Sequence, residues 1–360
     1  MSCCIGVVTG GGDCPGLNSV IRAVAKAALR RGWKAIGILG GYEGLLSPQQ
    51  TLPLEGHVLD GLLVRGGTIL GTANRGRFSA KVGHGESRRL PVELLDETLE
   101  GCRQLGLAGL VSIGGDGSLS IAQQMHEHGI PVVGVPKTID NDLAATAMTF
   151  GFDSAVACAT DALDRLHSTA ESHKRVMVLE VMGRYAGWIA IYAGLAGGAD
   201  VILIPEIPFR YDSICAKVQE REQAGKAFTI VIVAEGARPL GADFVTTGSQ
   251  VQNREARLGG IGAQVAEEIA QRTGKETRCV VLGHLQRGGR PTNMDRALCT
   301  MFGAKAVELI AEQKFGQMVA FTGTQITSVP LSEATSRLRT VPLEGGFVTT
   351  ARSLGICLGD

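Results

Sequence analysis

The sequence predicts an α/β protein with two Rossmann-like, three-layer domains whose sheets are mainly parallel. Three observations predict this fold: short β-branched runs alternate with helical patterns, the 360 residues exceed one small domain, and 50 glycines accompany only 4% aromatic residues. Such alternation is typical of parallel sheets covered by helices, and glycines suit the short turns between them. Because ligands of these sheets bind beyond the carboxyl ends of strands, we expect the active site in the cleft between the domains.

The predicted strands are eight short runs rich in β-branched residues. In chain order they are residues 5–8, 35–39, 110–113, 132–135, 176–181, 201–204, 229–233 and 279–282. Between them, apolar residues recur at helical spacing from Leu17 to Ala28 and from Ile261 to Ile269. These helices are expected to cover the sheets with their apolar faces.

The division into domains follows from the number of strands, which exceeds one small sheet. A helix expected over residues 153–171 opens with an Asp-Ser cap and crosses into the second domain. We predict one domain from residues 1–150 plus about 286–335, and another from residues 151–285 plus the C-terminal tail.

Composition and charge argue against several classes of function. Basic and acidic residues number 35 each, so the net charge indicates neither a nucleic acid nor an anionic membrane as a partner. The amino terminus has no signal-like region, which predicts a cytoplasmic protein. The longest uncharged apolar stretch, residues 185–199, is shorter than the roughly 20 residues that span a bilayer. The nine cysteines lack metal-type spacing and are interpreted as reduced thiols.

Two glycine-rich loops each follow a predicted strand and precede a predicted helix. The first reads Gly-Gly-Gly-Asp-Cys-Pro-Gly at residues 10–16, and the second reads Gly-Gly-Asp-Gly-Ser at residues 114–118. Glycines let backbone N–H groups approach a phosphate, and the helix amino terminus adds a favourable dipole. Asp116 suits a magnesium ion held beside phosphates. The alternatives are a structural tight turn in the first loop and a helix cap in the second.

A third polar segment, Pro-Lys-Thr-Ile-Asp-Asn-Asp, follows the strand at 132–135 and occupies residues 136–142. Its two carboxylates, Asp140 and Asp142, could divide the work of catalysis. One would take a proton while the other orients magnesium. The alternative is a polar turn without chemistry.

Positive groups lie at the ends of the later strands of an otherwise neutral protein. Arginine forks match phosphate oxygens bidentately, so these groups indicate a second anion site for a phosphorylated substrate. For any one of them the alternative is a solvated surface charge. His284 is expected to contact substrate rather than metal, because no other His or Cys lies at ligand spacing. The residues are Lys174, Arg175, Arg184, Arg278, His284 and Arg287.

Taken together, these motifs closely resemble the phosphofructokinase family. Met-Gly-Arg at 182–184 and Leu-Gly-His-Leu-Gln-Arg-Gly-Gly at 282–289 complete the set, which runs in order from residue 4 to about 310. The resemblance implies phosphoryl transfer from Mg-ATP to the 1-hydroxyl of D-fructose 6-phosphate in glycolysis. It implies Mg²⁺ as cofactor, ATP as co-substrate, and a homotetramer or homodimer whose substrate site is shared across subunits.

The resemblance also implies a role for each matching residue. The first predicted domain would bind nucleotide and the second sugar phosphate. Catalysis would involve Asp140 as general base with Thr138, Asp142 and Arg184, and the metal ligands would be Asp116 and Asp142. The nucleotide would contact Gly12, Arg75, Asp116, Gly117 and Ser118, with Tyr42 near the base or ribose. Fructose 6-phosphate would contact Thr138, Asp140, Met182, Gly183, Arg184, Glu235, His284 and Arg287, with Arg175 and Arg278 supplied by a neighbouring subunit.

The choice of phosphoryl donor depends on Gly117 and Lys137. In family members that use pyrophosphate, Asp and Lys occupy these places, whereas typical bacterial ATP enzymes have Gly at both. A carboxylate at 117 would crowd and repel the α-phosphate of a nucleotide, so glycine there predicts ATP. A pyrophosphate-dependent phosphofructokinase is the alternative. A non-catalytic sugar-phosphate-binding subunit would be expected to lack Asp140, and a NAD or lipid kinase would not explain residues 284–287.

Three further places depart from the family pattern. Asn74 stands where ATP enzymes place an arginine that bridges the two substrates, and Arg75 is the expected substitute with Arg77 as the alternative. A basic effector cluster would leave Arg22, Lys26 and Lys226 as remnants, but Phe228 stands at one basic position, so effector control is not carried over. The tail after about residue 320 matches weakly and has no assigned role.

Overall fold

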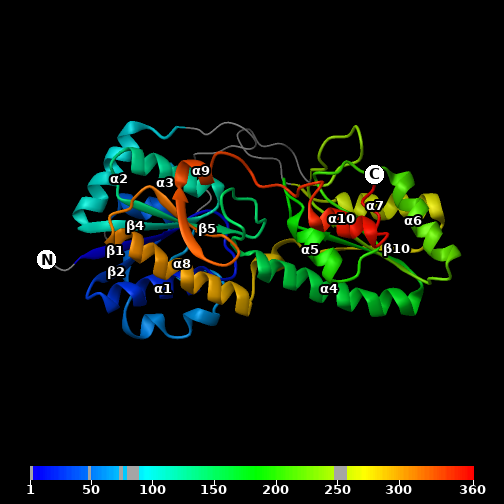
Figure 1. The fold of residues 1–360 in the computed structure, drawn as a ribbon, viewed down its shortest axis with the longest axis horizontal. Coiled ribbons are helices and arrows are strands. Elements are labelled where there is room, and N and C mark those ends of the chain that lie inside the picture. The colour runs from blue at the N-terminus through cyan, green and yellow to red at the C-terminus, as the bar shows by residue number, and fades with distance from the viewer. Residues whose placement is uncertain (1–2, 48–49, 73–75, 79–88, 247–257) are drawn as a thin grey trace. The chain divides into compact units, whose positions relative to one another are not determined.

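The computed structural model describes residues 3–47, 50–72, 76–78, 89–246 and 258–360. The chain folds into two compact units, both visible in Figure 1. Unit 1 comprises Met1–Ile139, Leu143–Ser154 and Arg287–Leu338, and unit 2 comprises Asp140–Asp142, Ala155–Gln286 and Arg339–Asp360. Each unit contains its own sheet with mainly parallel pairing. The predicted α/β class is therefore confirmed.

Unit 1 is built on an eight-stranded sheet in the order β12-β11-β5-β4-β1-β2-β3, with β6 paired to β5. The strands are β1 (Cys4–Thr9), β2 (Lys34–Ile38), β3 (Thr51–Pro53), β4 (Leu107–Gly114), β5 (Val132–Thr138), β6 (Phe150–Gly151), β11 (Gln317–Phe321) and β12 (Ile326–Pro330). The edge strands β3 and β12 pair antiparallel with their neighbours, and the inner strands pair parallel. The carboxyl ends of β1, β4 and β5 therefore meet at one edge of the sheet.

Helices cover both faces of this sheet. They are α1 (Leu17–Arg30), α2 (Val92–Gln104), α3 (Asp116–Glu127), α8 (Asn293–Ala311) and α9 (Leu331–Ala334), with short 3-10 helices η1 (Gly41–Leu46), η2 (Gly56–Leu59) and η3 (Leu62–Val64). In Figure 1, α1 and α8 lie on one face, and α2, α3 and α9 lie on the other. Gly303 of α8 permits close packing on α1, because a Cβ there would lie 2.6 Å from the Cβ of Ala23. Leu94, Leu119 and Leu331 are buried in one core on the opposite face.

Unit 2 contains a parallel sheet in the order β10-β7-β9-β8. Its strands are β7 (Val176–Val181), β8 (Val201–Leu203), β9 (Thr229–Ala234) and β10 (Thr277–Val281), and its helices are α5 (Trp188–Ala196), α6 (Tyr211–Gln223), α7 (Ile261–Thr273), η4 (Gly283–Arg287) and α10 (Gly346–Ser353). Val231 and Val233 share a core with α6 and α7. Ile202 and Ile232 point to the other face, where Gly194 of α5 packs against both. This alternation is the period of two expected of a strand.

All eight strands and the three helices predicted from the sequence are present. The predicted crossing helix is α4 (Phe152–His173), whose first residues belong to unit 1 and whose remainder belongs to unit 2. Strands β3, β6, β11 and β12 were not predicted. None of the helices in the described part of the chain is both long and apolar enough to cross a bilayer.

Candidate active site

The first glycine-rich loop leaves the carboxyl end of β1 and lies directly against the second. The backbone N–H of Gly10 donates to the carbonyl of Ile113 at 2.9 Å. A Cβ on Gly10 would lie 2.6 Å from the Ser118 hydroxyl and 2.9 Å from the ring of Tyr42. Gly11 has φ of 75°, which favours glycine. The contact between the loops therefore requires the absence of a side chain at position 10.

Tyr42 binds the backbone of the second loop through its hydroxyl. Its hydroxyl is 2.6 Å from the Ser112 hydroxyl and donates to the carbonyl of Ser118 at 2.8 Å. The ring is buried, and burial raises the pKa of the Tyr42 phenol. These bonds place Tyr42 under the loop, and its predicted contact with a nucleotide base or ribose stays a prediction.

The second loop leads into α3, which begins at Asp116. Asp116 and Gly117 are partly exposed, whereas Ser118 is buried. The first turn of a helix carries N–H groups without helical partners, which suit an anion. A carboxylate among them adds an oxygen ligand of the kind that Mg²⁺ prefers. Among the described residues, no group of three or more His, Cys, Asp or Glu side chains forms a ready-made metal site.

Two cationic side chains reach the first loop within unit 1. Lys137 is only 5% exposed, and its ammonium donates to the carbonyl of Gly12 at 2.5 Å. The guanidinium of Arg287 packs against Gly12 so closely that a Cβ there would lie 1.7 Å from its Nη1. The structure therefore brings Lys137 and Arg287, which are distant in sequence, to the same glycine loop.

The third segment passes from unit 1 into unit 2. Thr138 closes β5, and its carbonyl accepts a bond from the hydroxyl of Thr149 at 2.7 Å. Asp140 and Asp142 are partly exposed and flank Asn141, which is 1% exposed. Asn141 has φ of 51°, a conformation that asparagine tolerates better than most residues. This turn presents the two carboxylates on either side of one buried residue.

The predicted sugar-phosphate residues after β7 and β9 lie together in unit 2. The N–H of Glu235 donates to Val181 at 2.8 Å, and the N–H of Gly236 donates to Gly183 at 3.1 Å. Gly183 has φ of 136°, which requires glycine in practice. Arg184 lies over the ring of Tyr185, with 5.6 Å from the guanidinium carbon to the ring centroid. Met182 is buried beside them.

Arg175 and Arg278 share one acid within the same chain. Arg175 pairs with Glu276 at 2.8 Å, and Arg278 pairs with the same carboxylate at 2.5 Å. The hydrogen bond from Arg175 is the main cause that lowers the pKa of Glu276. His284 lies just beyond β10 in η4 and is exposed. Both arginines are thus held by one carboxylate of their own chain, and their supply to a neighbouring subunit stays a prediction.

Of the arginines predicted to replace the missing bridge between substrates, Arg75 lies outside the described residues, as does Asn74. Arg77 is described. Its guanidinium makes two bonds to Glu97, at 2.6 and 2.8 Å, and its N–H donates to Glu43 at 2.5 Å. In this structure Arg77 is held by carboxylates of unit 1.

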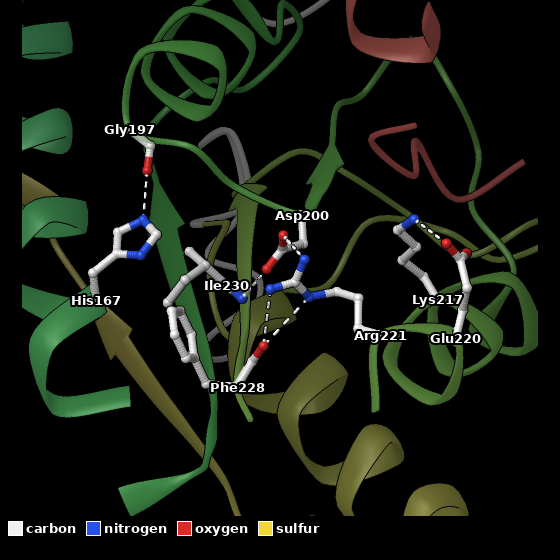
Figure 2. A network of polar contacts seen from close by, with 8 residues as sticks. All are labelled: His167, Gly197, Asp200, Lys217, Glu220, Arg221, Phe228 and Ile230. Carbon is white, nitrogen blue, oxygen red and sulfur yellow. Dashed lines mark hydrogen bonds and ion pairs between the residues drawn. The ribbon is translucent and has the colours of Figure 1, made fainter. Parts of the chain in front are cut away.

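Phe228, which stands at an expected effector position, belongs to a polar network shown in Figure 2. Arg221 pairs with Asp200 at 2.6 Å, and its Nη2 donates to the carbonyl of Phe228 at 3.1 Å. Burial raises the pKa of Asp200. The Phe228 ring packs edge-on to His167. Arg221 therefore binds the protein's own backbone here.

Sequence reasoning missed two polar residues of unit 1 that lie outside the motifs and bind backbone groups distant in the chain. Asn18 is fully buried in α1, and its amide nitrogen donates to the carbonyls of Arg65 and Gly66, each at 3.1 Å. Its amide oxygen accepts from Ile69 at 2.8 Å. The Thr72 hydroxyl donates to Gly11 at 2.6 Å. A polar residue on the apolar face of α1 was the available signal for Asn18.

Known proteins similar to this chain were found by sequence and by structure. Residues 4–310 match the family Phosphofructokinase. An ATP-dependent 6-phosphofructokinase of Chloroflexus aurantiacus is 54% identical over 99% of this chain and 98% of its own length. A pyrophosphate–fructose 6-phosphate 1-phosphotransferase of Amycolatopsis methanolica is 50% identical over 94% of this chain and 96% of its own length. Phosphofructokinase from Saccharomyces cerevisiae has a TM-score of 0.80 at 31% identity, covering 93% of this chain and 45% of that one.

Proposed function

The chain belongs to the phosphofructokinase family, and we propose that it transfers the γ-phosphoryl group of ATP to the 1-hydroxyl of D-fructose 6-phosphate, a reaction of glycolysis. The observation that carries this proposal is the pairing of the two glycine loops at the carboxyl edge of the unit 1 sheet, with Lys137 and Arg287 beside them. Phosphoryl transfer depends mainly on positioning and charge neutralisation. A cradle of N–H groups with two cations supplies both.

Unit 1 would bind the nucleotide, and unit 2 would bind the sugar phosphate. The N–H groups of the two loops, with Gly12, Gly117 and Ser118, would hold the phosphates. Asp116 fits a magnesium ion because it offers an accessible carboxylate within the loop, and Asp142 would supply a second. When bound, the ion neutralises charge on the phosphate oxygens.

Asp140 would act as the general base. As the oxygen of the 1-hydroxyl attacks the γ-phosphorus, its proton passes to the Asp140 carboxylate. The bond between the γ-phosphorus and the β,γ-bridging oxygen breaks, which leaves ADP and fructose 1,6-bisphosphate. Thr138 and Arg184 would stabilise the charge on the transferring group. Partial exposure of Asp140 is compatible with direct contact to the sugar.

The remaining residues would recognise fructose 6-phosphate. Met182, Gly183 and Glu235 would form one side of the site, which the hydrogen bonds between the segments after β7 and β9 support. His284 and the arginines would bind the 6-phosphate with charge-assisted hydrogen bonds. Arg175 and Arg278 would reach the site of a neighbouring subunit in a homotetramer or homodimer. We expect this protein to act in the cytoplasm.

Pyrophosphate is the alternative donor, favoured by Lys137 and by the Amycolatopsis methanolica relative. In this structure Lys137 binds the carbonyl of Gly12. It therefore supports the loop that would hold the phosphates of either donor. Gly117 remains the residue that favours ATP, since it leaves space beside the α-phosphate.

Initial rates with ATP and with pyrophosphate against fructose 6-phosphate, with and without magnesium, test the proposal. We expect ATP to support magnesium-dependent turnover. Asp140→Asn should lower kcat by about 10²- to 10⁴-fold while calorimetry still detects fructose 6-phosphate binding. Asp60→Asn, at an exposed residue, is the matched control. Turnover with pyrophosphate but not with ATP would refute ATP as the donor. An active Asp140→Asn variant would remove Asp140 from the mechanism.

A further inference from the structure

The weakly matching C-terminal tail contacts the segment that carries the proposed base. Within unit 2, the N–H of Arg339 donates to the carbonyl of Asp142 at 2.7 Å. The Nη1 of the same arginine donates to the carbonyl of Asn141 at 3.3 Å. One residue of the tail thus binds two consecutive carbonyls of the turn after Asp140. Both acceptors are backbone carbonyls, so neither bond occupies a carboxylate that is proposed to act in catalysis.

Arg339 is in turn fixed by Trp188, the first residue of α5. The guanidinium carbon lies 4.3 Å from the centroid of the indole, and the indole Nε1 donates to the carbonyl of Arg339 at 3.0 Å. A guanidinium over an indole face is a favourable cation–π contact, which strengthens when water is excluded. Trp188 is buried. The arginine is therefore held on both its side chain and its backbone.

Glu206 accepts hydrogen bonds from tail residue Val341 and from Gly187, which precedes α5. Its Oε1 accepts from the N–H of Val341 at 2.7 Å, and both oxygens accept from the N–H of Gly187, at 3.0 and 3.1 Å. Gly187 lies three residues beyond Arg184 of the proposed sugar-phosphate site. Tail residues 339–341 therefore join the turn after Asp140 to the segment that follows Met182–Arg184.

The turn that Arg339 binds is one that needs support. Asn141 has positive φ, which is less favourable for a residue with a side chain than for glycine. Arg339 donates to the carbonyls of Asn141 and Asp142, and these two bonds hold the turn in this conformation. A displacement of about 1 Å in a reacting group can cost about 100-fold in rate.

We propose that Arg339 is a positioning residue of the phosphoryl transfer: it holds the backbone after Asp140 so that the base meets the sugar hydroxyl, and Trp188 and Glu206 hold the tail in place. This inference rests on the proposed function. Arg339 does not need to touch either substrate. Its loss should therefore lower the rate of the chemical step more than the affinity for substrate.

The first test compares Arg339→Met, Arg339→Lys and Arg337→Met in the full chain. Methionine keeps an unbranched apolar side chain but removes the guanidinium, so the bond to Asn141 and the contact with the Trp188 ring are lost while the backbone bond to Asp142 remains. Arg337 is an exposed control two residues upstream. We expect kcat of Arg339→Met to fall by about 10- to 100-fold, with little change in the calorimetric dissociation constant of fructose 6-phosphate. Lysine should recover part of kcat, because it restores a cation and a donor but not the planar fork.

A second measurement reads the contact without turnover. The chain has two tryptophans, so Trp33→Phe leaves Trp188 as the one fluorophore of its kind. In that background Arg339→Met should shift the emission maximum of Trp188, since it removes the cation from the indole face. Arg337→Met should leave the maximum unchanged.

The outcomes separate the inference from the proposed function. If the wild-type chain does not phosphorylate fructose 6-phosphate, the proposed function fails and the positioning role falls with it. If the wild type is active but Arg339→Met keeps the kcat of Arg337→Met, the inference alone is wrong. A variant that only loses thermal stability, with unchanged kcat while folded, would show a merely structural arginine and would also overturn it. An unshifted Trp188 emission would contradict the contact.

Discussion

At the scale of single residues, the candidate site depends on two kinds of position. At some positions there is no room for a side chain, and at others a charged side chain is buried, which is unfavourable unless it is hydrogen-bonded. Gly10 belongs to the first kind, because Ser118 and Tyr42 fill the space that its Cβ would need. Lys137 belongs to the second, because its ammonium is buried and bound to Gly12. Burying a cation is unfavourable unless it is paired or hydrogen-bonded. Both kinds of residue hold the two glycine-rich loops in this conformation without a ligand.

Gly10→Ala should separate the two loops. The new methyl would meet the Ser118 hydroxyl at 2.6 Å and the Tyr42 ring at 2.9 Å, so one loop must move. Overpacking of this kind costs about 1–3 kcal/mol of unfolding free energy, and we expect KM for ATP to rise as well. Gly346→Ala is the control, because nothing lies within 4 Å of its Cβ position. Urea unfolding and ATP kinetics that match the control would refute the close approach.

Gly117→Asp should impair the use of ATP. The added carboxylate would repel the nucleotide phosphates and occupy the space beside them. We expect kcat/KM for ATP to fall by about tenfold or more, equal to roughly 1.4 kcal/mol of transition-state stabilisation. Gly117→Asn adds similar volume without charge, so it separates crowding from repulsion. If ATP turnover of Gly117→Asp equalled that of the wild type, Gly117 would lose its role in donor choice.

At the scale of elements, buried polar groups of unit 1 join the amino termini of α4 and α8. Asp295 in the first turn of α8 accepts from the N–H groups of Gly151 and Ser154, at 3.0 and 2.9 Å, and from the Ser154 hydroxyl at 2.6 Å. The Ser154 hydroxyl in turn accepts from the N–H of Thr292, which caps α8. Each helix thus supplies partners to the first turn of the other. This junction fixes the start of α4 beside β6.

The Asp295 junction should make stability depend on pH. Burial raises the pKa of Asp295 to about 6, above its ordinary 3.8, so the folded state binds the proton more tightly than the unfolded state. The contribution of Asp295 to stability is therefore present at low pH and is lost as pH rises through about 6, by about 1 kcal/mol between about pH 5 and pH 7. Asp295→Asn should remove this slope, whatever constant penalty the amide adds.

Urea unfolding across that pH range measures the slope for both proteins. Other titrating groups cancel in the difference between wild type and variant, because they are common to both. Equal slopes, or a wild-type stability that rises through pH 6 relative to Asp295→Asn, would contradict the raised pKa of this carboxyl.

Sequence patterns predicted the elements with strong local signals and missed those defined by partners. The inner strands, such as β1 and β9, are continuous apolar runs because both faces are buried. By contrast, β6 has two residues and exists only through pairing with β5. The partly buried edge strand β12 lacks an apolar run of this kind. Its position depends on the hairpin with β11, which no local pattern specifies.

The same reason limits the prediction of the candidate site. Motif residues such as Asp116 and Arg184 were identified because they follow strands within glycine-rich segments. Asn18 and Arg339 act through backbone carbonyls of residues far away in the chain. Such bonds leave no spacing rule in the sequence, because the acceptor can belong to any residue type. They become visible only when the fold brings the segments together.

At the scale of the whole molecule, one edge of the unit 2 sheet is suited to an interface between copies of the chain. Among the described residues, no strand pairs with the outer edge of β10. Leu285, just beyond the strand, is 68% exposed, and Val281 is also exposed. Exposed strand edges with apolar residues favour association. The side chain of Arg278 is 57% exposed on this strand, so a partner that covered β10 would meet it.

Mixing two inactive variants should restore activity if Arg175 and Arg278 serve the site of a neighbouring subunit. One chain carries Asp140→Asn, and the other carries Arg175→Met with Arg278→Met. In a mixed oligomer, a site whose base comes from the second chain can receive both arginines from the first. With random association, each of these two conditions holds for about half of the sites, so about a quarter of the wild-type activity should return in the unselected mixture. Purified mixed dimers should show about half, because one of their two sites is complete.

Co-expression of the two chains with different tags, followed by purification on both, isolates the mixed oligomers for this assay. Each variant purified alone controls for residual turnover, and the purified chains mixed without subunit exchange control for simple addition. If the arginines served the site of their own chain, every site in the mixture would carry a defect and no activity would return. Partial recovery of activity therefore requires a site shared between chains, because two chains that fold and bind nucleotide separately would recover no activity.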